Sequence, residues 1–340
     1  MNRSGISPHL KRIFGLIALS LAIFAHSKNI YAQVYQGTED DFALELGSGI
    51  PLSVEKLRLR EYLSGVSDYQ IGDSWGKKPV LESDLPSRSP AYIRAVLATA
   101  SFNSATAFYL GRFGQWHVMA TNHHVLERSS DCQSRRANFV LLKKRFSCAS
   151  MIGSWPEIDL ALFTISVPES DSKLLQSVGR NFDFKSELME DTALITAGFG
   201  IAGNSNRELM VNDNDDCRVM SNNGEFRLMA DPDEYNPASY QAWSFSTGCS
   251  VSHGDSGSAM VNKINGAVVG LLWTGAIPKE ARIQNSSYLR QLQKEDSDEI
   301  WSLLTYAVPA TKISEKLKSE LQSGRLKNED KEIVQLILDK

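Results

Sequence analysis

The feature that most constrains the fold is the pattern of short apolar runs that begins at Ala91, each run broken by turn residues. Runs of about four to eight residues, rich in β-branched and aromatic side chains, are typical of strands in β-barrels and sandwiches. The chain therefore predicts an all-β domain from this point onward. The runs are Ile93–Ala98, Ala107–Leu110, Trp116–Ala120, Phe139–Leu142, Leu160–Ile165, Ala193–Ala197, Ser258–Val261 and Ala267–Trp273.

Two stripes of apolar residues follow at the C-terminal end, separated by Gly324. A spacing of about four residues places side chains on one face of a helix, and glycine is a common residue just past a helix end. The sequence therefore predicts two amphipathic helices. The first stripe is Ile313, Leu317 and Leu321, and the second is Ile333, Leu336 and Ile337.

The segment before the all-β region carries few long apolar runs and ends in Leu85–Pro90, where two prolines flank serine and arginine. Such a stretch is typical of a boundary or an exposed linker. We expect a signal peptide in residues 1–32, an N-terminal extension or pro-segment in 33–90, the main domain in 91–320 and a helical tail in 321–340. Whether the extension is removed or packs on the domain stays open.

The first 32 residues have the layout of a secretory signal peptide. A positive leader (Arg3, Lys11 and Arg12) precedes residues 13–24, which are apolar except for Gly15 and Ser20, and two possible exits with small residues follow at Ala25–Ser27 and Tyr31–Ala32. An uncleaved membrane anchor is the alternative, but these 12 residues fall short of the roughly 20 that a helix needs to cross a bilayer. We expect a secreted or periplasmic protein without stable membrane insertion after cleavage.

Removal of residues 1–32 changes the formal net charge from −4 to −8, because it takes away four cations and no anions and leaves 32 basic against 40 acidic residues. A mildly acidic protein is a poor ligand for nucleic acids and for anionic membranes. The charge therefore argues against both as the main partner.

Four cysteines follow the leader, and an even number in an exported chain favours two disulfides. Of the three possible pairings, the simplest closes two local loops by joining Cys132 to Cys148 and Cys217 to Cys249. Zinc is the alternative, but no cysteine pair has the two-residue spacing of a zinc knuckle, and no histidine stands nearby at ligand spacing. We expect two disulfides and no metal site.

The segment Gly254-Asp255-Ser256-Gly257 is the strongest candidate for chemistry. Its glycines let the backbone bend tightly, so that the amides of Gly254 and Ser256 can point at one oxygen. Hydrolysis by a serine nucleophile needs such donors, together with a serine hydroxyl held against a neutral imidazole. A polar turn between two strands is the alternative. We predict Ser256 as the nucleophile and the Gly254 and Ser256 amides as the oxyanion hole.

His124 and Asp159 are the predicted partners of this serine. His124 follows an apolar run, and a short helix there would carry its ring over the domain. It does not chelate a metal with His123, because adjacent residues on a strand point to opposite faces. Asp159 stands at the head of an apolar run, where a buried carboxylate needs a strong partner. The alternative is that Asp159 is exposed and only caps the strand. Glu157 is the nearest competitor of Asp159 for the role of the acid.

Taken together, the histidine segment, the Asp-Leu-Ala-Leu segment and the Gly-Asp-Ser-Gly segment resemble the chymotrypsin-like (trypsin-like) serine peptidases over about residues 91–320. The order His124, Asp159, Ser256 matches that family and differs from the Ser, acid, His order of α/β-hydrolases. The resemblance implies two six-stranded antiparallel β-barrels of the chymotrypsin type with a C-terminal helix. It also implies a serine endopeptidase that acts on proteins or peptides and needs no cofactor.

Two further segments look like bacterial members of this family, of the HtrA and glutamyl-endopeptidase types. They are Thr121–Val125, which reads Thr-Asn-His-His-Val, and Tyr306–Pro309, which a predicted helix follows. Only some 20 residues follow the domain, so an HtrA-like assembly is not implied and we expect a monomer.

The chain departs from the family pattern near the expected specificity pocket. Ser258 stands where glycine is usual, and Ser250, at the place that often floors the pocket, is not the aspartate that would favour Arg or Lys. Leu272 takes the place of the histidine of glutamate-specific members. The resemblance implies a pocket made of Ser250, Leu272, Trp273, Thr274 and Gly275, and these residues favour a neutral or apolar substrate side chain.

Activation leaves two alternatives. In zymogen members the aspartate before the nucleophile pairs with a newly freed N-terminus. This chain has no Arg or Lys followed by the Ile-Val-Gly-Gly that such members usually carry at the cleavage site. Arg88 and Arg94 are weak candidates for processing. The other possibility is that Asp255 pairs with an internal cation and that no cleavage is needed.

The predicted mechanism is acyl transfer, in which His124 takes the Ser256 proton, Asp159 orients His124 and water hydrolyses the acyl-enzyme. One competing interpretation is a catalytically inactive protease homologue that acts as a binding module. Another is a zinc-dependent or structural disulfide protein. The intact set of His124, Asp159 and Ser256 argues against a pure binding module.

Overall fold

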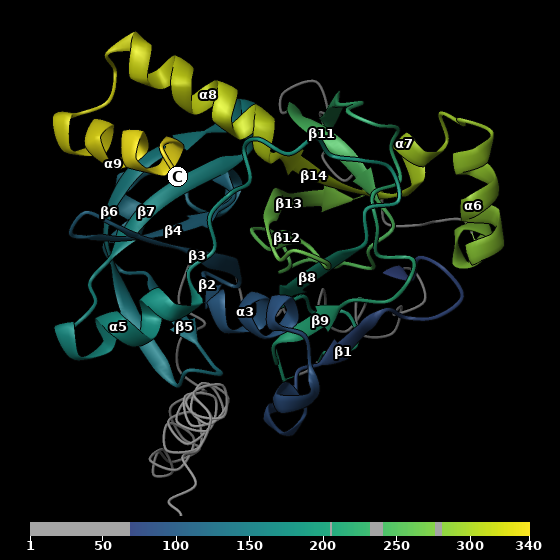
Figure 1. Cartoon of the computed structure of the whole chain (residues 1–340), viewed down its shortest axis with the longest axis horizontal. Helices are drawn as coiled ribbons and strands as arrows, with labels where there is room; N and C mark the ends of the chain where they lie inside the picture. Colours follow the sequence, from purple (N-terminus) through teal and green to yellow (C-terminus); the bar gives the residue numbers. More distant parts are fainter. Residues whose placement is uncertain (1–68, 205, 232–240, 276–280) are drawn as a thin grey trace, which may run out of the picture. The chain divides into compact units, whose positions relative to one another are not determined.

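The computed structural model describes residues 69–204, 206–231, 241–275 and 281–340. The predicted signal peptide (1–32) and the larger part of the predicted extension (33–90) lie outside these residues. In the described part, the chain is mostly β, with a closed six-stranded barrel, an eight-stranded sheet and helices at the C-terminal end (Figure 1).

The barrel confirms the first of the two predicted barrels. Its strands follow the order β2-β3-β4-β7-β6-β5, and β2 pairs with β5 to close it. The rings of Phe102 and Phe163 stack in its core, with centroids 4.6 Å apart. The predicted run at 139–142 contributes only Phe139, because the chain turns directly after it. The strands are β2 Thr99–Phe102, β3 Ala105–Phe113, β4 Trp116–Thr121, β5 Arg136–Phe139, β6 Lys144–Trp155 and β7 Leu160–Ile165.

The other strands form an eight-stranded sheet, so the predicted second six-stranded barrel is not confirmed. Their order is β1-β9-β8-β12-β13-β14-β11-β10. At the two ends of this order, β1, from the predicted extension, pairs with β9, and β10 pairs with β11. The strands are β1 Lys77–Pro79, β8 Leu194–Gly198, β9 Met210–Asn212, β10 Arg227–Ala230, β11 Gln241–Thr247, β12 Ala259–Asn262, β13 Val268–Gly275 and β14 Thr305–Pro309.

The apolar run at 93–98 is a helix, contrary to the prediction of a strand. It lies in α3, Pro90–Ala98, which begins with Pro90 at the first helical position. The hydroxyl of Ser89 caps this end by accepting a hydrogen bond from the Tyr92 amide at 3.2 Å. Serine caps and N-terminal prolines both favour helix initiation, and here they outweigh the β-like composition of the run.

The two predicted C-terminal helices are present as α8, Ala310–Ser323, and α9, Asn328–Leu338. Gly324 ends α8 in the left-handed conformation, with φ of 71°. α8 packs on β13 and β14, whereas α9 packs on β3 and β6 of the barrel (Figure 1). Residue 321, where the predicted tail begins, lies in the last turn of α8.

The cysteines pair as predicted. Cys132 and Cys148 join α4 to β6, and Cys217 and Cys249 join the segments that flank the β10–β11 hairpin. None of the helices described has the length and hydropathy to cross a membrane. The same residues contain no cluster of three or more His, Cys, Asp or Glu side chains that fits a metal ion. The other helices are η3 Glu82–Ser87, η4 His123–Val125, α4 Ser129–Cys132, η5 Pro156–Ile158, α5 Glu169–Val178, η6 Ala281–Gln284, α6 Ser286–Lys294 and α7 Ile300–Leu303.

Candidate active site

The pairing of two barrel strands brings His124 and Asp159 together. β4 ends at Thr121, which lies opposite Ala161 near the start of β7. His124 is in η4, the turn that follows β4, and Asp159 directly precedes β7. The neighbouring strand ends therefore carry the two side chains to the same place on the barrel.

Asp159 is held in an uncommon backbone conformation, with φ of 35° and ψ of 46°. Aspartate enters this left-handed region more readily than most residues other than glycine. The side-chain amide of Asn122 donates a hydrogen bond to the Asp159 carbonyl at 2.9 Å, and the residue is fully buried. The turn therefore aims a buried carboxylate at η4.

Both carboxylate oxygens of Asp159 accept hydrogen bonds from His124. The backbone amide donates to Oδ1 at 3.1 Å, and ring atom Nδ1 lies 2.8 Å from Oδ2. The imidazole is 37% exposed, whereas the carboxylate is 0% exposed. This arrangement uses Nδ1 for orientation and leaves Nε2 as the ring nitrogen that can take a proton.

The charge of Asp159 also changes the pKa of His124, the predicted base. Burial by itself lowers the pKa of His124, but the Asp159 carboxylate and its hydrogen bond outweigh that effect and raise the pKa above its ordinary value. A raised pKa makes the imidazole a stronger base. It also means that the ring becomes neutral only at a correspondingly higher pH.

The turn that carries Ser256 is held by the barrel. The hydroxyl of Thr106, on β3, donates to the Gly254 carbonyl at 2.8 Å, and the Thr106 amide donates to the Ser256 carbonyl at 3.0 Å. Gly257 has φ of +87°, and a Cβ there would lie 2.0 Å from the Thr106 carbonyl oxygen. Glycine is therefore required where the turn meets β3.

The amides of Gly254 and Ser256 are the predicted oxyanion donors. Gly254 also has a positive φ, at 95°. Within the described part of the chain, neither amide donates a hydrogen bond. The two amides at and near Ser256, the predicted nucleophile, thus have the donor capacity that an oxyanion needs.

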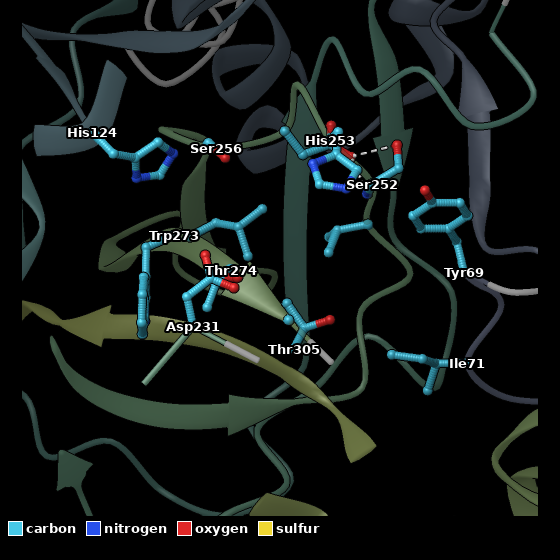
Figure 2. A pocket seen from close by; sticks show the side chains of 14 residues that line it. Tyr69, Ile71, His124, Asp231, Ser252, His253, Ser256, Trp273, Thr274 and Thr305 are labelled. Atoms are coloured by element: carbon cyan, nitrogen blue, oxygen red, sulfur yellow. Dashed lines mark hydrogen bonds between the residues drawn. The ribbon is translucent and has the colours of Figure 1, made fainter. Parts of the chain in front are cut away.

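A cavity of about 200 Å³ opens beside Ser256. His124 and Ser256 lie at one side of it, and Tyr69 and Ile71 lie at the opposite side (Figure 2). Its lining is Tyr69, Ile71, His124, Asp231, Val251, Ser252, His253, Asp255, Ser256, Leu272, Trp273, Thr274, Gly275 and Thr305.

The cavity contains four of the five residues predicted for the specificity pocket. Leu272, Trp273, Thr274 and Gly275 line it, but Ser250 does not. The Ser250 side chain is buried, and its hydroxyl accepts a hydrogen bond from the Ile71 amide at 3.2 Å.

Sequence reasoning missed the residues that the N-terminal segment contributes to the cavity, Tyr69 and Ile71. They precede the segment that resembles the family, and no motif marks them. His253 and Thr305 were also missed, although each directly precedes a segment that carries the resemblance, Gly254–Gly257 and Tyr306–Pro309. The position of His253 next to Gly254 was a usable signal.

Asp255 pairs with an internal cation, which was one of the two alternatives left open by the sequence. The ammonium group of Lys77 forms a salt bridge with Oδ1 of Asp255, and both side chains are only 2% exposed. Oδ2 accepts a hydrogen bond from the Ser252 amide at 2.8 Å.

No curated protein matches the chain. Among solved structures, it is similar to an inactive mutant form of Rv3671c from M. tuberculosis H37Rv, with 16% identity, a TM-score of 0.47, and coverage of 76% of this chain and 100% of that one. It is also similar to the HtrA-type protease AlgW with a decapeptide, with 14% identity, a TM-score of 0.40, and coverage of 65% of this chain and 51% of that one.

The sequence of residues 105–271 matches the family model of the trypsin-like peptidase domain. His124, Asp159 and Ser256 all fall inside the matched residues, whereas Tyr69, Ile71 and Lys77 precede them. The chain is therefore a member of the trypsin-like peptidase family through residues 105–271.

Proposed function

We propose that this protein is an exported serine endopeptidase that hydrolyses peptide bonds through an acyl-enzyme on Ser256. The observation that carries the proposal is the 2.8 Å contact between His124 Nδ1 and Asp159 Oδ2, on the cavity that Ser256 also lines. A buried carboxylate, an oriented imidazole and a serine on a glycine-flanked turn are the groups that acyl transfer requires.

The reaction begins when Nε2 of His124 takes the hydroxyl proton of Ser256 and Oγ bonds to the substrate carbonyl carbon. The amides of Gly254 and Ser256 donate hydrogen bonds to the resulting oxyanion. His124 then gives the proton to the leaving nitrogen as the C–N bond breaks. Water repeats the sequence, with the same imidazole as base, and releases the acid product and free Ser256.

The cavity supports a preference for an uncharged side chain before the scissile bond. Ile71 and Leu272 offer apolar surface, and Thr274 and Thr305 offer hydroxyl groups. None of the described residues that line it is Lys or Arg, which disfavours acidic side chains. Asp231 also lines the cavity and would attract a cation, whereas the lining residue Asp255 is already paired with Lys77. Profiling with a peptide library tests the preference for an uncharged side chain. Dominant cleavage after Arg, Lys or Glu would refute it.

Export is the second part of the proposal. The signal-like residues 1–32 and the two disulfides support a periplasmic or extracellular location, because disulfides persist in oxidising compartments. We propose a monomer that acts on proteins or peptides.

Covalent labelling with a fluorophosphonate probe tests the chemistry. Ser256→Ala should abolish labelling, because the probe bonds only to an activated serine oxygen. His124→Ala should reduce the labelling rate strongly, and His123→Ala is its matched control, because the His123 ring contacts Ser154 at 2.7 Å, whereas the His124 ring contacts Asp159 at 2.8 Å. Persistent labelling of Ser256→Ala, or absence of labelling in the native protein, would contradict the proposal. The second result would favour a binding module.

A further inference from the structure

Lys77 stands out among the charged residues outside the predicted catalytic set. Lysine is almost never fully buried unless it is paired, and here both members of the Lys77–Asp255 salt bridge are 2% exposed. Lys77 lies on β1, opposite Asn212 of β9. The Lys77 side chain, at the start of the end strand β1, thus reaches the interior beside the turn that carries Ser256.

The carboxylate of Asp255 is fully occupied in this position. Oδ1 accepts hydrogen bonds from Lys77 and from the Gly200 amide at 2.9 Å, and Oδ2 accepts from the Ser252 amide at 2.8 Å and from the Ser252 hydroxyl at 3.5 Å. A Cβ at Gly200 would lie 2.1 Å from Oδ2. The carboxylate is therefore packed closely against the Gly200 backbone and is held through both of its oxygens.

That backbone lies between the two predicted oxyanion amides, because Asp255 directly follows Gly254 and directly precedes Ser256. Removal of the Lys77 charge would leave a buried carboxylate without its cation. A buried anion in that state is strongly disfavoured, so Asp255 would turn towards water and take the Gly254 and Ser256 amides with it.

We infer that Lys77 is a positioning residue for the proposed reaction, and that its ammonium group holds the oxyanion turn in place without any cut in the chain. The inference rests on the proposed function. It implies that the active protein keeps residues 69–79, so this part of the predicted extension is not a removable pro-segment.

The same segment is anchored at two further points. The Ile71 amide donates to the Ser250 hydroxyl at 3.2 Å, and the Asp73 amide donates to the Ser286 hydroxyl at 3.1 Å. Tyr69 and Ile71 also line the cavity. Loss of this segment would therefore open the cavity as well as remove the cation.

Lys77→Met tests the inference, because methionine keeps a comparable length and removes the charge. We expect kcat and the rate of fluorophosphonate labelling to fall by about 10²-fold, the effect of losing one oxyanion donor, with a smaller change in KM. Lys78→Met is the matched control, since Lys78 is exposed on the same strand, and it should label at the native rate. Lys77→Arg should recover part of the loss.

A purely structural role would lower the melting temperature of Lys77→Met but leave the labelling rate of its folded molecules unchanged, and that result would overturn the inference. The N-terminus of the labelled native protein provides a test that does not depend on the variant folding. Labelled protein that retains Lys77 supports the inference, and labelled protein that begins after Lys77 overturns it. Absence of labelling in the native protein would instead refute the proposed function.

Discussion

Replacement of Asp159 by asparagine should nearly abolish activity while the fold persists. Asparagine also enters the left-handed backbone region, so the turn before β7 can form. The carboxamide, however, has one acceptor where the carboxylate has two. In the native site both acceptors are in use, one by the His124 amide and one by Nδ1.

The hydrogen-bond pattern determines the size of the effect. If the asparagine oxygen accepts from the His124 amide, its NH₂ group faces Nδ1, which must then be the unprotonated nitrogen. Nε2 would carry the proton and could not accept one from Ser256. A wrong tautomer of this kind costs about 10⁴-fold in kcat, which corresponds to about 5 kcal/mol of transition-state stabilisation.

The assay is kcat/KM on a peptide substrate across a pH series, with thermal unfolding as the check on folding. In the native protein the rate should rise with pH as His124 loses its proton, and this limb should lie above the ordinary pKa of histidine because Asp159 raises the pKa of His124. In Asp159→Asn the limb should move to lower pH, because the neutral amide no longer stabilises the charged imidazole.

Glu157→Gln is the matched control, because it makes the same chemical change two residues away on an exposed side chain whose carboxylate contacts Lys316. It should leave kcat/KM within about twofold of the native value, as expected of a surface ion pair. Activity of Asp159→Asn within tenfold of the native value, with an unchanged acid limb, would refute the assigned role of Asp159.

Two further predictions concern stability and the cavity. Paired replacement of Cys132 and Cys148 by alanine should lower the free energy of unfolding by about 3 kcal/mol, and paired replacement of Cys217 and Cys249 should lower it by about 4 kcal/mol. The reason is that these cross-links close loops of 16 and 32 residues. Denaturant titration measures both changes, and an unfolding free energy equal to that of the native protein in either variant would contradict the prediction. Ile71→Ala should widen the cavity and shift cleavage towards larger apolar side chains, at a cost of roughly 2–5 kcal/mol in stability because Ile71 is 1% exposed; an unchanged profile in a peptide library would show that Ile71 does not limit substrate size.

Features that depend on neighbouring residues could be predicted from the sequence. The four-residue spacing of apolar side chains predicted α8 and α9, and Gly324 marked the end between them. The even number of cysteines predicted two disulfides, and the pairing that closes the shortest local loops is the one in the structure. The run at 93–98 shows the limit of composition, because Ser89 and Pro90 start a helix there despite its β-like texture.

Contacts between distant segments could not be predicted in this way. The sequence indicated that Asp255 pairs with a cation or with a chain terminus. It could not indicate which one, because no sequence spacing relates Asp255 to a lysine 178 residues away. The second barrel was expected from family resemblance, and the eight-stranded sheet includes β1 only through its pairing with β9, which is also a distant contact.

Lys77 and Lys78 show what the sequence of a strand determines and what only its pairing in the tertiary structure determines. The sequence establishes that two lysines are adjacent, and the period of a strand requires that they point to opposite faces. It does not establish which lysine faces inward. The pairing of β1 with β9 makes that choice, burying Lys77 against Asp255 and exposing Lys78, because register is set by contacts across the sheet and not by the residues of one strand.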